Sequence, residues 1–338
     1  MRYISNLPKI KWGSIDTLFD SRPVILITSP ASLKKSKNMI KNLNIVETIY
    51  IKSAEKEYAK KLVKEKHVGK VIYALGGGRV CDLGRFIAYN WNLEIICVPT
   101  IISTDAFLVD CTGLRDKGCV TYFPSKKADL VLLDYNLLKK SPKRFHLSGC
   151  GDVLSIYTGL FDWKYANNRK KAAEDEKYSE SVALMAESIF RGLLTESSEI
   201  RKVSKKGLIY LVQFLAMEVQ LCNFYGNSRP EEGGEHFFTY AMENKLKKFL
   251  HGEMIAFSVL LTAFIQGQDI IEIKSFMDSV GIKYVLEGLN RPIVLKALNE
   301  MQGYVKMHHL RYSIYNDLSS ERIKKLNLEK FFSLIQLN

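Results

Sequence analysis

The chain has 338 residues, of which 47% are hydrophobic and 25% are charged. This length and composition indicate an ordinary globular protein with room for two domains, and they argue against a disordered or fibrous chain. The net charge of +13 raises the possibility of a nucleic-acid or anionic-surface partner. The lysines, however, are spread along helical stretches rather than gathered with aromatic residues. We therefore expect a solvated basic surface that attracts phosphorylated small molecules, and no nucleic-acid partner.

The cysteines and apolar runs predict the compartment. None of the six cysteines forms a CxxC pair, and several lie in apolar runs, which is typical of a reducing environment. No apolar run reaches the roughly 18 residues of a membrane span. The N-terminus also lacks the apolar core of a signal peptide. We expect a soluble, cytoplasmic protein.

Hydrophobic periodicity divides the chain into two halves. Short β-branched runs alternate with amphipathic stretches, which predicts parallel strands with crossover helices at 24–27, 46–51, 71–75, 95–98 and 130–133. After about residue 148 the apolar residues recur at helical spacing. The prediction is an α/β domain over residues 1–145 and an all-α domain over 146–338, with a ligand bound between them.

Three glycines follow the predicted strand at 71–75. Gly76, Gly77 and Gly78 are succeeded by Arg79, Val80 and an apolar-periodic helix. Glycines let a backbone approach a phosphate, and the start of a helix offers free N–H groups and a favourable dipole. This context favours binding of a dinucleotide pyrophosphate, although a tight turn alone also explains the glycines.

A polar segment follows the strand at 95–98. Thr100, Ser103 and Asp105 lie where open α/β sheets bind their ligands. The alternative is that Ser103 or Asp105 caps a helix.

One carboxylate and two imidazoles in the helical half form a candidate metal site. Asp152 follows a glycine turn at the start of a helix, His236 follows Gly233-Gly234-Glu235, and His251 lies 15 residues later. Three protein ligands with an open position are the pattern of catalytic zinc, which polarises a carbonyl. The spacing matches no short zinc motif, so a structural histidine and a carboxylate that complements a helix dipole are the alternatives.

Together these segments resemble the superfamily of iron-containing alcohol dehydrogenases and dehydroquinate synthases, which includes glycerol dehydrogenase. Two of the motifs, Ser148-Gly149-Cys150-Gly151-Asp152 and Asp162-Trp163-Lys164, resemble its glycerol-1-phosphate dehydrogenase branch. The other motifs that carry the resemblance are the glycines at 76–78 with Asp82, Val98-Pro99-Thr100 with Asp105, Ser228-Arg229-Pro230, and Gly234-Glu235-His236 with His251.

The resemblance implies a Rossmann-like N-terminal domain, a helical metal domain and a deep cleft between them. It implies that residues 76–80 hold the pyrophosphate of NAD or NADP, with Thr100 and Ser103 near the nicotinamide. Asp105 would contact substrate hydroxyls. Asp152, His236 and His251 would bind one divalent metal, most simply Zn²⁺, with Fe or Ni as alternatives, and Asp152 would also touch substrate. A homo-oligomer is implied as well.

The sequence departs from the family pattern in three places. Arg79 replaces a small residue after the glycines, and it either adds a cation at the pyrophosphate or crowds it. Tyr240 stands where the family has a second histidine; its phenol can hydrogen-bond a substrate hydroxyl or phosphate, but its ordinary pKa of about 10 is unsuited to acid–base work at neutral pH. The stretch 106–110 has become Ala-Phe-Leu-Val-Asp, a bulkier wall near Asp105.

The expected reaction is hydride transfer between a nicotinamide cofactor and a polyol or polyol phosphate, with glycerol 1-phosphate and dihydroxyacetone phosphate as the favoured pair. The alternatives are a sugar-phosphate cyclase like dehydroquinate synthase, and a non-catalytic anion- or nucleic-acid-binding protein with the same fold. No acidic residue follows Thr28-Ser29-Pro30 to bind a ribose hydroxyl, and Lys34 and Lys35 lie nearby, so NADP stays open beside NAD. The candidates for binding a substrate phosphate are Lys117, Lys126, Lys127 and Arg229.

Overall fold

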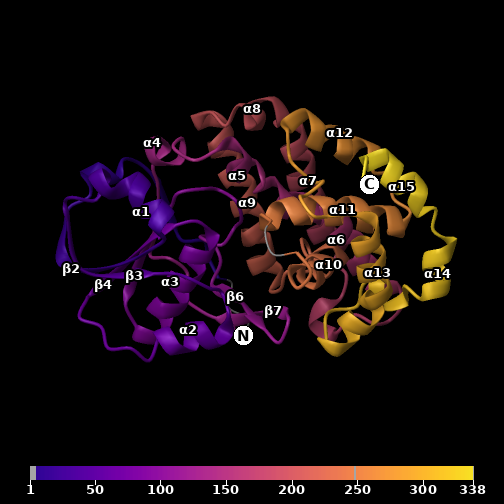
Figure 1. Cartoon of the computed structure of the whole chain (residues 1–338), viewed down its shortest axis with the longest axis horizontal. Coiled ribbons are helices and arrows are strands. Elements are labelled where there is room, and N and C mark those ends of the chain that lie inside the picture. Colours follow the sequence, from indigo (N-terminus) through magenta and orange to yellow (C-terminus); the bar gives the residue numbers. More distant parts are fainter. Residues whose placement is uncertain (1–4, 247–248, 338) are drawn as a thin grey trace. The chain divides into compact units, whose positions relative to one another are not determined.

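The computed structural model describes residues 5–246 and 249–337, and the chain divides into two compact units (Figure 1). One unit is Asn6–His146. The other begins at Leu147, contains the rest of the described chain and includes Ser5. The first unit is α/β and the second is helical, so the predicted fold class is confirmed.

The first unit is built on a six-stranded sheet in the order β1-β8-β5-β4-β2-β3, in which every pair of neighbours is parallel. The central strands are continuous apolar runs because a parallel sheet is covered on both faces. The chain moves from β2 outward to β3 and then crosses to the other side of β2 with β4, so the strand order reverses between β2 and β4. The strands are β1 (Lys9–Trp12), β2 (Asp20–Thr28), β3 (Leu43–Tyr50), β4 (Val71–Gly76), β5 (Glu94–Pro99) and β8 (Leu130–Leu133).

All five predicted strands are present, and the sequence reasoning missed the short edge strand β1 and a separate hairpin. The helices of this unit are α1 (Pro30–Ser36), α2 (Lys56–Leu62), α3 (Gly78–Trp91), α4 (Tyr135–Leu138) and α5 (Lys143–Leu147), with 3-10 turns at Ile15–Thr17 and Lys37–Met39. The hairpin pairs β6 (Cys111–Asp116) with β7 (Cys119–Pro124) through a two-residue turn whose residues, Lys117 and Gly118, both have positive φ.

The fully buried Arg85 on α3 fixes the segment that leads into this hairpin. Its guanidinium donates to the carbonyls of Ala106, Val109 and Cys111, and it pairs with Asp82 at 2.6 Å. A buried guanidinium is tolerated only when its donors are satisfied. Arg85 therefore holds in place the same 106–110 stretch in which this chain departs from the family pattern.

His146 is a packing residue that joins two loops of the first unit. Its Nδ1 accepts from the amide of Ile102 at 3.2 Å and its Nε2 lies 3.1 Å from the carbonyl of Leu138. Burial lowers the pKa of His146 from 6.5 to about 4, although the Leu138 carbonyl opposes the shift. Between about pH 4 and pH 6.5, His146 is therefore protonated in the unfolded chain and neutral in the folded chain.

This difference predicts a stability change with pH. The contribution of His146 is present in full above pH 6.5, declines as the pH falls through that value, and is lost by about pH 4. Between pH 7.5 and pH 5 we expect the wild-type protein to lose about 2 kcal/mol more stability than His146→Gln. Urea denaturation of both proteins at the two pH values measures this; an equal loss in both would contradict the assignment.

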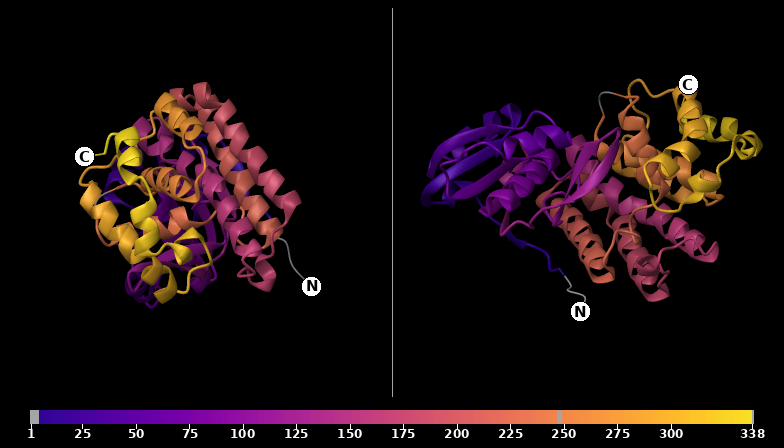
Figure 2. Two further views of the ribbon diagram at one scale, coloured as in Figure 1. Left: turned by 90° about the vertical axis from the view of Figure 1, so that its right-hand side faces the viewer. Right: turned by 90° about the horizontal axis from the view of Figure 1, so that it is seen from below.

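The second unit contains helices and no strand among its described residues. Its centre is α11 (His251–Gln266), which is apolar on all sides and packs against α6 (Cys150–Asn168) and α10 (Gly234–Glu243). Helices α6, α7 (Glu180–Thr195) and α9 (Lys205–Tyr225) run side by side (Figure 2). The remaining helices are α8 (Ser197–Lys202), α12 (Ile271–Val280), α13 (Arg291–Met307), α14 (Ser320–Lys325) and α15 (Leu328–Ile335), with 3-10 turns at Glu174–Glu176 and Ile314–Asp317.

By length and composition alone, one described helix, α9, could cross a membrane. The prediction that no apolar run reaches this length missed it. Half of its apolar window is buried inside the protein. Contacts of α9 with α6, α7 and α8 explain that burial, so a place in the core accounts for its composition without a membrane. The cytoplasmic location stays a prediction.

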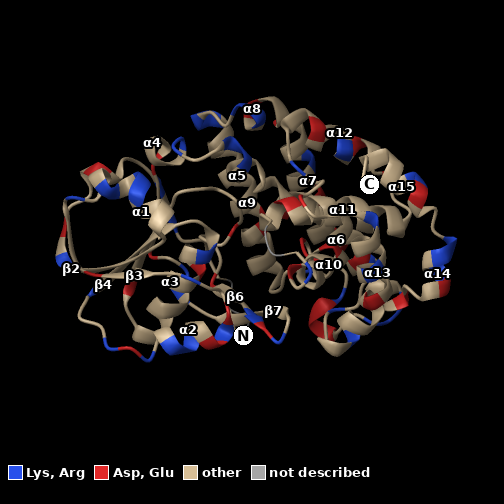
Figure 3. Ribbon diagram, in the orientation of Figure 1, with Lys and Arg blue, Asp and Glu red and all other residues tan. Residues whose placement is uncertain are grey.

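Basic and acidic residues alternate along the ribbon of both units (Figure 3). Many surface lysines and arginines pair with carboxylates, for example Lys56 with Asp116 at 2.6 Å and Arg191 with Glu272 at 2.6 Å. These ion pairs agree with the expected solvated basic surface, and the absence of a nucleic-acid partner stays a prediction.

Candidate functional site

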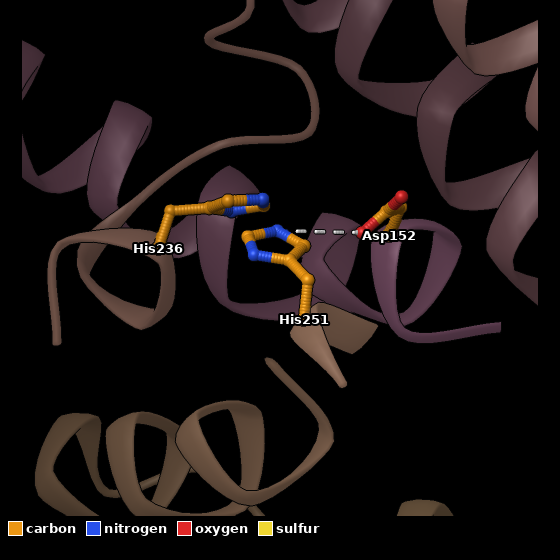
Figure 4. Close-up of side chains that lie close together, drawn as sticks. All are labelled: Asp152, His236 and His251. Atoms are coloured by element: carbon orange, nitrogen blue, oxygen red, sulfur yellow. Dashed lines mark ion pairs between the residues drawn. The ribbon is translucent and has the colours of Figure 1, made fainter. Parts of the chain in front are cut away.

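The three predicted metal ligands lie together in the second unit. The candidate ligand atoms of Asp152, His236 and His251 are all within 4.8 Å of one another. Their side chains point toward a common centre, and the Nε2 of His251 is 3.9 Å from the Oδ1 of Asp152 (Figure 4). Asp152 and His236 are buried, while the His251 side chain is 31% exposed. This cluster stands at the starts of three different helices, so residues 99 positions apart in the chain meet at one point.

Two glycines bring the ligand-bearing helices together. A Cβ on Gly151 would lie 2.3 Å from the carbonyl oxygen of Gly252, and a Cβ on Gly252 would lie 1.8 Å from the carbonyl oxygen of Ser148. Real Cβ contacts are never this short. The first turns of α6 and α11 are therefore in backbone contact, and this contact places Asp152 beside His251.

A carboxylate fixes the orientation of His236. Its Nδ1 lies 2.9 Å from the Oε1 of Glu235, which is fully buried. Because a carboxylate only accepts, Nδ1 carries a proton, which leaves Nε2 as the nitrogen that a metal can bind once its own proton is displaced. Burial lowers the pKa of His236, but the hydrogen bond to Glu235 and the carboxylates of Glu235, Glu232 and Asp152 outweigh it and raise the pKa to about 9.

A second carboxylate lies on the other side of His251. The Nδ1 of His251 is 4.0 Å from the Oε1 of Glu243, the last residue of α10, while its Nε2 faces Asp152. Each imidazole thus has one nitrogen toward the cluster and the other toward a carboxylate, the arrangement found around metal-binding histidines. The chemistry of the donor set therefore fits a divalent cation with one carboxylate and two imidazole ligands.

Tyr240 is buried and already has a hydrogen-bond partner. Its hydroxyl donates to the Oε1 of Glu232 at 2.7 Å, and its ring centroid is 6.1 Å from that of His236. The other oxygen of Glu232 accepts from Ser228 at 2.5 Å and lies 3.6 Å from Arg311. Burial raises the pKa of Glu232, but Arg311, His236 and these hydrogen bonds outweigh it, so the net shift is downward. Tyr240 thus anchors the segment that precedes α10, and its proposed contact with substrate stays a prediction.

The glycine turn lies at the end of β4, next to the reversal in strand order. Gly77 is the N-cap of α3, and a Cβ on Gly78 would lie 2.7 Å from the Thr104 hydroxyl. The side chain of Val80 packs against Gly76, whereas Arg79 is exposed. The start of a 14-residue helix therefore presents its amides beside residues with little side chain, as phosphate binding requires. The exposure of Arg79 leaves that turn uncrowded.

The polar segment after β5 is packed against the same turn. The amide of Thr100 donates to the carbonyl of Gly76 at 2.9 Å, and its side chain is buried 3.4 Å from the Ser32 hydroxyl. Ser103 and Asp105 are partly exposed. Neither residue starts a regular helix, so the alternative that they act as helix caps is not what the structure shows. Of the three residues, Thr100 contacts the glycine turn directly. The roles of Thr100, Ser103 and Asp105 toward a ligand stay predictions.

The supposed substrate wall at 106–110 is mostly interior. Phe107 and Leu108 are buried within the first unit, and Asp110 is exposed. The bulky residues Phe107 and Leu108 therefore pack in the core of the first unit, and Arg85 bonds the backbone on either side of them.

The candidate phosphate-binding cations are mostly engaged elsewhere. Arg229 is fully buried and pairs with Glu176 at 2.8 Å. Lys126 pairs with Asp129, and Lys127 donates to the Asn6 carbonyl. Lys117 is exposed at the hairpin turn. The burial of Arg229 and its pairing with Glu176 make it a structural residue, whereas the pair of Lys126 with Asp129 is partly exposed.

The segment after β2, considered above for binding the ribose of the cofactor, has only some of its polar groups free to bind a ligand. Ser29 caps α1 by accepting from the amide of Ser32, and Lys35 donates to the Ser141 hydroxyl at 3.0 Å. Lys34 is exposed. Of the two lysines considered for a 2′-phosphate, Lys34 alone is unengaged in this part of the described chain.

Sequence reasoning missed the residues that position the site. Glu235 was visible as part of the Gly-Glu-His motif, but its role needed the geometry around Nδ1 of His236. Glu243 and Arg85 carried no sequence signal, because their partners are distant in the chain or are backbone carbonyls.

Comparison with known proteins gives consistent matches. A family model described as iron-containing alcohol dehydrogenase matches residues 28–142. The glycerol-1-phosphate dehydrogenase, NAD(P)+, of Sulfolobus acidocaldarius is 27% identical over 97% of this chain and 97% of its own length. That of Picrophilus torridus is 27% identical over 98% of this chain and 95% of its own.

Solved structures share the fold. Glycerol dehydrogenase from Schizosaccharomyces pombe superposes with a TM-score of 0.69 at 17% identity, covering 98% of this chain and 93% of that one. A probable glycerol dehydrogenase from Sinorhizobium meliloti 1021 superposes with a TM-score of 0.64 at 20% identity, covering 90% of each chain.

Proposed function

Because the chain is a glycerol-1-phosphate dehydrogenase-like member of the iron-containing alcohol dehydrogenase superfamily, we propose that it is a metal- and NAD(P)-dependent oxidoreductase. Its proposed substrates are glycerol 1-phosphate and dihydroxyacetone phosphate. The observation that carries the proposal is the cluster of Asp152, His236 and His251, whose ligand atoms lie within 4.8 Å of one another.

The residues of the second unit would hold the metal and the reacting carbon. Asp152, His236 and His251 would be the protein ligands of the metal. When bound, the metal supplies Lewis-acid polarisation of a carbonyl, worth several kcal/mol of charge stabilisation in the transition state. Two imidazoles and a carboxylate suit Zn²⁺ best, and they also suit Fe²⁺ or Ni²⁺.

The residues of the first unit would hold the nicotinamide cofactor. The start of α3, with Gly77 and Gly78, would bind the pyrophosphate through backbone amides, and Thr100 and Ser103 would lie toward the nicotinamide. Lys34 is the available cation for the 2′-phosphate of NADP, so the assay must compare NAD with NADP. Asp105 would contact a substrate hydroxyl.

The test is a coupled assay of metal-replete protein across polyols and keto-phosphates with both cofactors. We expect stoichiometric oxidation of NADH or NADPH with dihydroxyacetone phosphate, and the reverse with glycerol 1-phosphate. Chelation of the metal should abolish both directions, and added Zn²⁺ should restore them. Release of inorganic phosphate without net cofactor turnover would instead indicate a sugar-phosphate cyclase, and no turnover with any substrate would favour a binding protein.

A further inference from the structure

One face of α6 contacts the segment that leads into α10. Residues 152, 155, 158, 159 and 162 lie on the same side of this helix because they recur every three or four positions. The Ser155 hydroxyl donates to the carbonyl of Glu231 at 2.5 Å, and a Cβ on Gly159 would lie 3.0 Å from the backbone of Glu231. Asp162 accepts from the amide of Gly234 at 2.7 Å. The helix that supplies the ligand Asp152 therefore also supports the backbone that precedes His236.

Glu235 lies at the centre of these contacts with both carboxylate oxygens in use. Its Oε1 accepts from the amide of Gly233 at 2.6 Å and from the Nδ1 of His236 at 2.9 Å. Its Oε2 accepts from the Thr158 hydroxyl at 2.7 Å. Glu235 and Thr158 are both fully buried. A carboxylate held at both oxygens cannot turn away from the imidazole, so the ring of His236 is fixed as well.

We propose that Glu235, oriented by Thr158, is the positioning residue that fixes the tautomer of His236 and thereby sets the affinity of the centre for its metal. This inference rests on the proposed metal centre. A series of hydrogen bonds joins the Thr158 hydroxyl of α6 to Glu235, and Glu235 to Nδ1 of His236. Nε2 of His236 is left as the ligand atom. No part of it was visible as a spacing in the sequence, since Thr158 and Glu235 are 77 residues apart.

The charge of Glu235 matters in addition to its geometry. A buried carboxylate bonded to one imidazole nitrogen makes the other nitrogen a stronger donor to a cation. Glutamine at 235 keeps the shape but removes the negative charge, and its amide can present either the oxygen or the NH2 group to His236, so it no longer fixes which nitrogen carries the proton. Loss of such a partner costs about 10- to 100-fold in metal affinity. Loss of the Thr158 hydroxyl removes one of the hydrogen bonds to the Glu235 carboxylate and leaves its charge in place, so we expect a smaller loss of metal affinity, about 3- to 10-fold.

The experiment measures Zn²⁺ and Co²⁺ affinity of the full chain by competition with a chelator. The variants are E235Q, T158V and T158S, with T239V as the matched control. Thr239 is a buried threonine of α10 whose hydroxyl bonds Ser258 at 2.9 Å, so T239V removes a comparable hydroxyl without touching Glu235. We expect E235Q to bind about 10- to 100-fold more weakly and T158V about 3- to 10-fold more weakly. T158S and T239V should bind like the wild type.

A second measurement separates positioning from general stability. Nitrogen-15 NMR of labelled histidine, recorded on the metal-free protein at a pH above the His236 pKa of about 9, should show the neutral ring protonated at Nδ1 in the wild type, T158S and T239V. In E235Q this signal should shift or exchange with the other tautomer, while the thermal midpoints of E235Q and T158V stay above the assay temperature. Equal metal affinity and an equal His236 spectrum in wild type and E235Q would overturn the inference.

His236→Ala distinguishes that failure from failure of the proposed function. If this variant retains the metal, the centre itself is wrongly assigned and the inference falls with it. If the variant loses the metal while E235Q binds normally, the centre stands and only the positioning role is wrong.

Discussion

Alanine at position 236 is expected to remove the metal and to lower kcat/KM by about three orders of magnitude, because Lewis-acid stabilisation of this kind is worth several kcal/mol. His236 is buried and is one of the three groups whose ligand atoms converge. Without it, a carboxylate and one partly exposed imidazole are left, one fewer than the three protein ligands of a catalytic zinc site. Metal content after dialysis and initial rates on dihydroxyacetone phosphate measure the two effects.

The matched control is His308→Ala. His308 belongs to the same unit and packs against Tyr304 with the two rings tilted and their centroids 4.4 Å apart, and the metal cluster does not include it. This variant should retain its metal and its rate. If His236→Ala retained the metal, the ligand assignment would be wrong; if it lost the metal yet kept its rate, the metal would be structural and the proposed chemistry would fail.

Gly252→Ala is expected to weaken metal binding by about 100-fold and to destabilise the second unit by about 1–3 kcal/mol. The new Cβ would lie 1.8 Å from the Ser148 carbonyl oxygen, whereas real contacts do not fall below 3.0 Å. The starts of α6 and α11 must therefore separate by about 1.2 Å, the difference between these distances. Because Asp152 and His251 sit in those first turns, the separation moves one ligand away from the other.

Chelator competition measures the metal affinity of this variant, and urea denaturation measures its stability. Gly303→Ala is the control, because Gly303 lies inside α13 with no atom within 4 Å of an added Cβ. Alanine is a better helix residue than glycine, so this control should stabilise the protein by about 0.5–1 kcal/mol and leave the metal affinity unchanged. Equal metal affinity in Gly252→Ala and the wild type would show that the backbone contact does not position the ligands.

The sequence alone was sufficient for the architecture because local patterns encode it. The five predicted strands lie within or overlap β2, β3, β4, β5 and β8. Short apolar segments separated by polar amphipathic stretches favour strands with crossover helices between them. Strand β1 was missed because Lys9–Trp12 is only four residues long, too short for its alternation of lysine with apolar residues to be distinctive. The hairpin β6–β7 was missed because its exposed residues weaken the period-two pattern.

The candidate ligands Asp152, His236 and His251 were named from residue type, local motifs and family resemblance, because chemistry restricts which side chains bind a metal. Only the tertiary structure decided how they are held. The contact between Gly151 and Gly252, and the path from Thr158 through Glu235 to His236, join segments that are 77 to 101 residues apart. No local pattern records such contacts, because they depend on the packing of α6 against α10 and α11. For the same reason Tyr240, read as a substrate contact from its place after His236, has its hydroxyl bound to Glu232 in the fold.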